Sequence, residues 1–138
     1  MMRMGPFTMV IDTSALAAVL FDECDSRRFV QAFDSAPRTF MSSFTWFETA
    51  VVVSARKGES GIRKLFELCS EIGVDVVPFD TGQSELAFDA WLRYGKGRHS
   101  AGLNLGDCSA YALSRTLHQP LLYKGEDFPR TDILSADP

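Results

Sequence analysis

Four acidic residues of this sequence stand where a strand ends, where a helix starts, or on an apolar helix face. They are Asp12, Glu48, Asp107 and Asp127. Carboxylates that cluster without counter-charges repel one another and raise each other's pKa. Such a set of hard oxygen ligands is stable near neutral pH when it holds Mg²⁺ or Mn²⁺. Two of these ions, about 3.5–4 Å apart, activate water and neutralise a leaving oxygen, which is the chemistry of phosphodiester hydrolysis.

Two of these acids follow expected strands. In "MVIDTSALAAVLFDE", residues 9–23, Asp12 lies between the end of an apolar strand and the start of a helix. A helix N-cap is the alternative role for it, because Asp is a favoured capping residue. Asp127 lies in "YKGEDF", after an expected strand at 120–123. Taken alone, Asp127 fits a surface turn better, because Gly and Asp are common turn residues.

The other two acids belong to helices. The helix expected at 43–57 has an apolar stripe that also contains Glu48. The stripe residues are Phe44, Phe47, Val51, Val52 and Ala55. We therefore expect Glu48 to face the core, where its lost hydration must be offset by a metal or by a structural ion pair with an Arg. Asp107 opens the helix "DCSAYALSRTLH", and an N-cap is again the alternative role.

Apolar strand patterns alternate with helical patterns along the chain. We expect strands at 7–11, 39–41, 74–79 and 120–124, and a further short one at 131–136. Helices are expected at 14–21, 25–34, 43–57 and 59–72, and from Thr81 and Asp107 onwards. This alternation predicts an α/β fold, a three-layer α/β/α sandwich around a small, mostly parallel sheet. Ligands of such sheets bind at the carboxyl ends of the strands, where all four acids could meet.

The bulk composition indicates one intracellular globular domain covering residues 1–138. The chain is 46% hydrophobic and carries a net charge of −4, so we do not expect nucleic acid to bind through a broadly basic surface. The three cysteines lack metal-binding spacing and are expected to be reduced thiols. The sequence shows no signal-peptide pattern and no apolar run of membrane length, which predicts a soluble cytoplasmic protein.

Several motifs, in order along nearly the whole chain, resemble those of one family. The segments "VIDTSAL", "FETAVVVS", "GKGRHSAGLNLGDCSAYALS" and "PLLYKGEDFPRTDI" are similar to successive motifs of PIN-domain ribonucleases, specifically VapC-type toxins of toxin–antitoxin systems. The resemblance implies an α/β/α sandwich and metal-dependent endonucleolytic cleavage of RNA. It also implies a cognate VapB-type antitoxin, whose C-terminal segment lies in a groove near the site, and a homodimer.

The resemblance carries over to specific residues of this chain. The family's acidic positions fall on Asp12, Glu48, Asp107 and Asp127, the four residues already singled out. We expect Asp12 and Asp107 to bind Mg²⁺ or Mn²⁺ directly, and the other two acids to complete the inner or water-mediated shell. Activated water then attacks a phosphorus of single-stranded RNA. Ser14 is expected to orient water or the phosphate, and Asn104 to support the site by hydrogen bonding.

Other residues suggest contacts with partners. The first two expected helices carry more apolar residues than one sheet face covers, which predicts an interface there. These residues are Leu16, Val19, Leu20, Phe21, Phe29, Val30 and Phe33. The basic residues Lys96, Arg98 and His99 lie in a loop before Asn104. Their positive charge could steer RNA phosphates toward the metal ions, or the loop could simply be solvated. The aromatic residues Trp46, Phe47, Trp91 and Tyr94 follow helical stripes and are expected in the core or at an interface.

Four other classes of protein compete with this interpretation. A phosphatase of the haloacid dehalogenase type needs a second Asp two residues after Asp12, where this chain has Ser14. A receiver domain needs an acidic pair that the segment before Ser14 lacks, and structure-specific DNA nucleases are larger. A non-catalytic PIN-like module that binds RNA or a partner remains the alternative, although degenerate members of that kind lose carboxylates that are all present here.

Overall fold

The sheet at the centre of the molecule has four short parallel strands. In the computed structural model, which describes residues 8–136, these are β1 (Met9–Ile11), β2 (Thr39–Ser42), β3 (Asp75–Val77) and β4 (Leu121–Leu122). Their order is β3-β2-β1-β4, and every neighbouring pair is parallel. The chain runs outward from β1 to β3 and returns on the other side of β1, so the switch point lies between β1 and β4.

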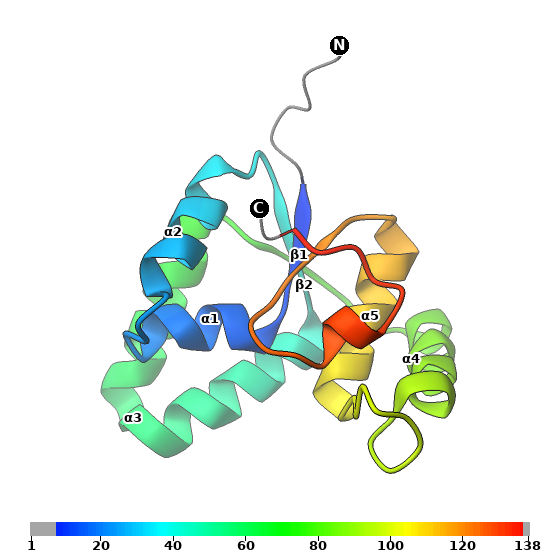
Figure 1. The fold of residues 1–138 in the computed structure, drawn as a ribbon. Helices are drawn as coiled ribbons and strands as arrows, with labels where there is room; N and C mark the ends of the chain where they lie inside the picture. The colour runs from blue at the N-terminus through cyan, green and yellow to red at the C-terminus, as the bar shows by residue number, and fades with distance from the viewer. Residues whose placement is uncertain (1–7, 137–138) are drawn as a thin grey trace.

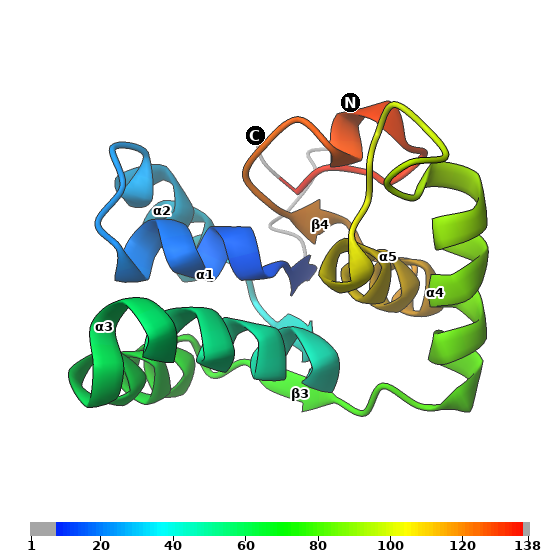
Figure 2. The ribbon, with the colours of Figure 1, turned by 90° about the horizontal axis from the view of Figure 1, so that it is seen from below.

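Helices cover both faces of this sheet, which confirms the three-layer prediction. Helices α1 (Thr13–Leu20), α2 (Ser26–Ser35) and α3 (Ser43–Ile72) lie on one side, and α4 (Thr81–Tyr94) and α5 (Leu105–Leu117) lie on the other (Figure 1). Figure 2, seen from below, separates the two helical layers with the strands between them. A 3₁₀ turn, Phe128–Arg130, follows β4.

Alternation along the strands divides the core into two halves. Met9 and Ile11 pack among the residues of α1, α2 and α3, whereas Val10 packs against α4 and α5. On β4, Leu121 and Leu122 are likewise buried on opposite faces. Because successive side chains of a strand point to opposite faces, these short strands supply both cores and hold their carboxyl ends at one edge.

The two expected helices at 43–57 and 59–72 are joined as one kinked helix. Gly58 interrupts α3 with φ 61° and ψ −151°, a conformation that favours glycine. Gly73, with φ 70°, ends the helix by donating its N–H to the Cys69 carbonyl. The expected break at Gly58 and stop at Gly73 are therefore confirmed, although the helix resumes directly after the kink.

Some element boundaries differ from the sequence-based expectation. Helix α5 begins at Leu105, two residues earlier than expected, because Asn104 rather than Asp107 is its N-cap. The segment expected as a strand at 131–136 makes only one isolated bridge, between Ser135 and Leu121. Residue 7 of the first expected strand lies outside the described residues.

The apolar stripe predicted for the first half of α3 does not face the core. Phe47 and Val51 are 61% and 53% exposed, and Ala55 is exposed as well. The buried residues of this half are Thr45, Thr49 and Val53. The Thr49 hydroxyl lies 2.7 Å from the Thr45 carbonyl, to which it can donate, whereas the Thr45 hydroxyl is buried without a hydrogen-bond partner in the described part of the chain.

Three of the seven residues of the predicted interface on the first two helices belong to the core instead, whereas Val19, Leu20 and Phe21 are half-buried and Val30 is 38% exposed. Leu16, Phe29 and Phe33 are fully or almost fully buried in the core shared by α1, α2 and α3. Leu68, Cys69 and Ile72 in the second half of α3 pack against this core. The prediction had considered only the sheet as a cover for the first two helices. In the described part of the chain, no helix is long and apolar enough to span a membrane. Cys24, Cys69 and Cys108 are free thiols.

Candidate active site

Asp12 follows β1 and is both buried and engaged as the N-cap of α1. Its Oδ2 accepts hydrogen bonds from the N–H and the hydroxyl of Ser14, at 3.1 and 2.6 Å. The Asp12 N–H donates to the Leu122 carbonyl of β4, so the residue sits at the switch point of the sheet. The capping alternative is therefore correct as geometry, and it leaves Oδ1 available at the carboxyl edge.

Glu48 reaches the same edge from α3 and is oriented by two threonines. The Thr13 hydroxyl donates to Glu48 Oε1 at 2.7 Å. The Thr49 hydroxyl lies 3.0 Å from that of Thr13 and can donate its one proton either to Thr13 or to the Thr45 carbonyl. Glu48 is half-buried, so it lies beside the fully buried face of α3 rather than on it. Sequence analysis did not identify Thr13 or Thr49 as supporting residues.

Asp107 lies in the first turn of α5, paired with its N-cap. The Asp107 N–H donates to Asn104 Oδ1 at 2.8 Å, and the Asn104 N–H donates to Asp107 Oδ2 at 3.1 Å. This reciprocal pair is a capping box, which fixes the rotamer of the Asp107 carboxylate. Asn104 thus holds Asp107 in place by hydrogen bonding.

Gly106 provides the space in which Glu48 and α5 approach each other. A Cβ at this position would lie 2.1 Å from Glu48 Oε2 and 2.3 Å from Oε1, which real side chains do not tolerate. The glycine of "LNLGD" is therefore needed for space at the site, a role that sequence analysis missed. Its position directly before a candidate acid was the signal that could have indicated it.

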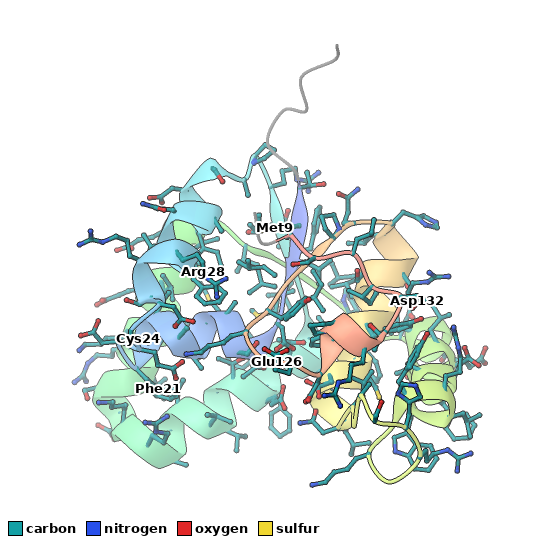
Figure 3. All side chains as sticks on the ribbon, in the orientation of Figure 1. Met9, Phe21, Cys24, Arg28, Glu126 and Asp132 are labelled. Carbon is teal, nitrogen blue, oxygen red and sulfur yellow. The ribbon has the colours of Figure 1, made fainter. Side chains whose placement is uncertain are left out.

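Asp127 is exposed, in a loop that Lys124 fastens to the rest of the site. The Lys124 N–H donates to the Ser14 hydroxyl at 2.8 Å, and its ammonium group binds Glu23 and Asp25 at 2.6 and 2.9 Å. Figure 3 shows this loop at its labelled residue Glu126, near the start of α1. Ser14 therefore bridges Asp12 and the loop, instead of presenting an unused hydroxyl. Lys124 was not identified from the sequence.

The electrostatics link the four acids into one cluster. Burial, with the charge of Glu48 adding to it, raises the pKa of Asp12 to about 6. Burial and then the charge of Asp12 raise the pKa of Asp107 to about 7, and Asp127 and Glu48 contribute in the same direction. Within residues 8–136, none of the four forms an ion pair with a basic side chain. The expected alternative of a Glu48–Arg pair is therefore excluded for the described residues.

This donor set suits a hard divalent cation. It consists of carboxylate oxygens whose charge is uncompensated by protein, and oxygen ligands are what Mg²⁺ and Mn²⁺ prefer. Within residues 8–136, no group of three or more His, Cys, Asp or Glu side chains is arranged so that it could hold a metal ion by itself. Magnesium sites commonly use one or two carboxylates and keep several waters, so a closed protein cage is not required.

An apolar groove of about 420 Å³ adjoins Glu48. Its apolar walls come from the start of α3 and the start of α5, and they include Phe47 and Leu105, which are 61% and 71% exposed. The groove also reaches Asn104 and Gly106, so it opens directly beside the carboxylates. The exposed apolar surface near the site thus lies on α3 and α5, away from the predicted interface on the first two helices.

Comparisons with known proteins agree with this geometry. The PIN domain family matches residues 9–134. Ribonuclease VapC30 of Mycobacterium tuberculosis is 50% identical over 128 residues, covering 93% of this chain and 98% of that protein. Among solved structures, Mycobacterium tuberculosis VapC20, a sarcin–ricin loop cleaving toxin, superposes with a TM-score of 0.77 at 19% identity, covering 94% of this chain and 99% of the other.

A toxin–antitoxin complex from Klebsiella pneumoniae contains a chain of the same fold. It superposes with a TM-score of 0.66 at 21% identity and covers 90% of this chain and 92% of the other. The match to the PIN domain family spans almost all of the described residues, and the similarity to VapC30 covers 98% of that protein. The chain therefore belongs to the PIN-domain family and, within it, to the VapC ribonucleases.

Proposed function

We propose that this protein is the toxin of a toxin–antitoxin system and hydrolyses RNA phosphodiester bonds with Mg²⁺ or Mn²⁺. Asp12 and Asp107 hold the cation directly, and Glu48 and Asp127 complete its inner or water-mediated shell. The observation that carries this proposal is the raised pKa of two acids, about 6 for Asp12 and about 7 for Asp107, in a cluster that forms no ion pair with a basic side chain within residues 8–136. A bound cation would reduce the repulsion between these carboxylates at neutral pH.

The residues around the acid cluster would hold its carboxylates in position for the cation. Asp12 and Asp107 are held in single rotamers by Ser14 and Asn104, so their oxygens are placed before a ligand arrives. Thr13 holds Glu48 toward the same edge. Bound there, a divalent cation would lower the pKa of water and neutralise charge on the phosphate.

The alternative function, a non-catalytic PIN-like binding module, has less support. All four carboxylates are present, and three of them are oriented by hydrogen bonds from neighbouring residues. A module that only binds RNA gains nothing from acids that repel the phosphate backbone. The 50% identity to a protein named as a ribonuclease also favours catalysis.

The proposed partners are a cognate VapB-type antitoxin and a second copy of the chain, and the proposed location is the cytoplasm. The toxin–antitoxin complex with the same fold supports the first partner. The groove beside Glu48 offers exposed apolar surface to a partner, and exposed apolar patches are typical of interfaces. An occupant of this groove would lie next to the carboxylates and block access to them.

The test of the proposal is cleavage of RNA by an Asp12→Asn variant purified without antitoxin. We expect at least a ~100-fold loss of cleavage, because a neutral amide replaces a carboxylate ligand, with the fold preserved because Asn also caps helices. Asp75→Asn, on an exposed residue paired with Arg38, is the matched control and should cleave normally. Full cleavage by Asp12→Asn in buffer containing the metal would reject the assignment.

A further inference from the structure

A basic loop, residues 96–102, is closed at its base and projects from the molecule beside the carboxylates. The Lys96 N–H donates to the Leu103 carbonyl and the Leu103 N–H donates to the Tyr94 carbonyl, both at 2.9 Å. Gly95 and Leu103 thereby form a parallel bridge between the end of α4 and the approach to α5. The loop is therefore an excursion with a fixed base rather than a loose connection.

The loop is held on one side by the segment that leads to Asp107 and on the other by the turn that follows Asp127. Directly after Leu103 comes Asn104, the cap that positions Asp107. On the other side, Arg130 Nη1 donates to the Ser100 carbonyl at 3.0 Å, and Arg130 ends the 3₁₀ turn that begins after Asp127. Figure 2 shows the loop extending from the end of α4 toward this turn. The loop thus borders the site between Asp107 and Asp127.

The loop and its anchor are positively charged, in contrast to the whole chain. Residues 95–103 include Lys96, Arg98 and His99 and no acid, whereas the chain carries a net charge of −4. Within residues 8–136, Lys96, Arg98 and Arg130 form no ion pair, unlike Arg38, Arg93 and Arg115. All three of these loop and anchor cations are exposed. A local positive surface of this kind attracts phosphates without a basic overall charge.

Arg98 is held ready to bind an anion. Its Nε–H donates to the Leu92 carbonyl at 3.1 Å, and its guanidinium lies 5.0 Å from the centroid of the Trp91 ring. Trp91 in turn stacks on Phe88, with 14° between the ring planes. These contacts fix the guanidinium plane and leave its two terminal nitrogens without a hydrogen bond in the described part of the chain. A fixed guanidinium fork matches two oxygens of a phosphate.

We infer that the basic loop binds the RNA backbone next to the scissile bond, with Arg98 as a fork on one phosphate and Lys96 as a point charge on another. This inference rests on the proposed ribonuclease function, and it favours the phosphate-steering role over the solvated-loop alternative. The loop presents charge and no large aliphatic side chain, so a polyanion fits it better than an apolar peptide segment. It explains how an acidic protein holds RNA beside a carboxylate cluster.

The test measures binding separately from cleavage. Fluorescence anisotropy with a labelled single-stranded RNA oligonucleotide is recorded for the Asp12→Asn protein with and without Lys96→Ala/Arg98→Ala, across a series of salt concentrations. We expect roughly tenfold weaker binding near 0.1 M salt, and a salt slope smaller by about 1.4, because two phosphate contacts are lost at about 0.7 each. When Lys96→Ala/Arg98→Ala is made without the Asp12→Asn substitution, RNA cleavage should show a raised KM and an unchanged kcat.

Two further variants make the result specific. Arg63→Ala/Lys64→Ala removes the same charge from exposed positions in the second half of α3 and should leave RNA affinity unchanged. Arg98→Lys keeps the charge, so the salt slope should persist while affinity falls because the fork is lost. Equal RNA affinity with and without the loop substitutions, or an equal loss in the α3 pair, would overturn the inference. Failure of the proposed ribonuclease function would instead show as absent wild-type cleavage while binding still depended on the loop.

Discussion

The carboxylate of Glu48 occupies the space that a side chain at Gly106 would need. A Cβ built on Gly106 would lie 2.1 Å from Glu48 Oε2, with Oε1 and Cδ almost as close. This contact joins α3 to α5, the two helices that lie on opposite sides of the sheet. The position of Glu48 in the acid cluster therefore depends on the absence of a side chain at residue 106.

The first prediction concerns the variant Gly106→Ala. The new methyl group should displace the end of the flexible Glu48 side chain, so we expect a loss of cleavage of about 10- to 100-fold, as for removal of a supporting group at a metal site. The free energy of unfolding should change little, because Ala is favourable in a helix and only a side-chain end moves. Steady-state cleavage and thermal unfolding measure the two effects.

Gly82→Ala is the matched control for this prediction. Gly82 is also in the first turn of a helix, and its Cβ would lie 3.6 Å from Asp80 Oδ1, an ordinary contact. It should retain full activity. In a Glu48→Gln background, Gly106→Ala should add little further loss if it acts through Glu48. Full additivity of the two substitutions would contradict this explanation.

The second prediction concerns Thr13, which holds Glu48. Thr13→Val removes the hydroxyl that donates to Glu48 Oε1 at 2.7 Å while preserving the shape of the side chain. We expect cleavage to fall by about 10-fold or more and the apparent affinity for Mg²⁺ to weaken. Thr13→Ser, which restores the hydroxyl, should recover most of the affinity. If Thr13→Ser were as impaired as Thr13→Val, packing rather than the hydrogen bond would be responsible.

The third prediction follows from the raised pKa values. Without metal, Asp12 and Asp107 keep protons in the folded state up to about pH 6 and 7, whereas the unfolded carboxyls release them near 3.8. The folded state thus binds more protons between these values, and the free energy of unfolding falls as pH rises through this window. For Asp12 the effect is on the order of 2–3 kcal/mol, since one pKa unit corresponds to about 1.4 kcal/mol.

Thermal unfolding in EDTA and in Mg²⁺, from pH 5 to pH 8, checks this prediction. Asp107→Asn should be more stable than wild type in EDTA at pH 8, and the difference should shrink toward pH 5. Added Mg²⁺ should stabilise wild type more at pH 8 than at pH 5, because protons compete for the ligands. Asp75→Asn, away from the cluster, should show neither trend. Stabilisation by Mg²⁺ that did not depend on pH would count against binding at these two acids.

Much of the fold could be predicted from the sequence, which also singled out the four acids as candidates. The short runs that became β1 and β4 are apolar and buried on both faces, a composition that is typical of strands in parallel sheets. Asp12 was identified because it directly follows such a strand. The start of α5 was misplaced because both Asn104 and Asp107 are capping residues, and only the reciprocal hydrogen bonds show which one precedes the helix.

Residues whose role depends on contacts between distant segments could not be predicted. Thr13 and Gly106 act through Glu48, which lies 35 residues from Thr13 in sequence. The face of α3 was misjudged because Thr45 and Thr49 count as polar in a hydropathy pattern, yet they are buried. Phe47 was expected in the core or at an interface, and its exposure at the groove beside Glu48 excludes the core.

The most direct test of the account is cleavage of defined transfer, ribosomal and messenger RNAs by purified, antitoxin-free protein. Reactions contain Mg²⁺, Mn²⁺ or EDTA, and wild type is compared with Asp107→Asn and with the control Asp75→Asn. We expect RNA to be cut by wild type and by Asp75→Asn in either metal, and not to be cut in EDTA or by Asp107→Asn. Cutting that persisted in EDTA or in Asp107→Asn, or no cutting of any RNA by folded wild-type protein, would contradict it.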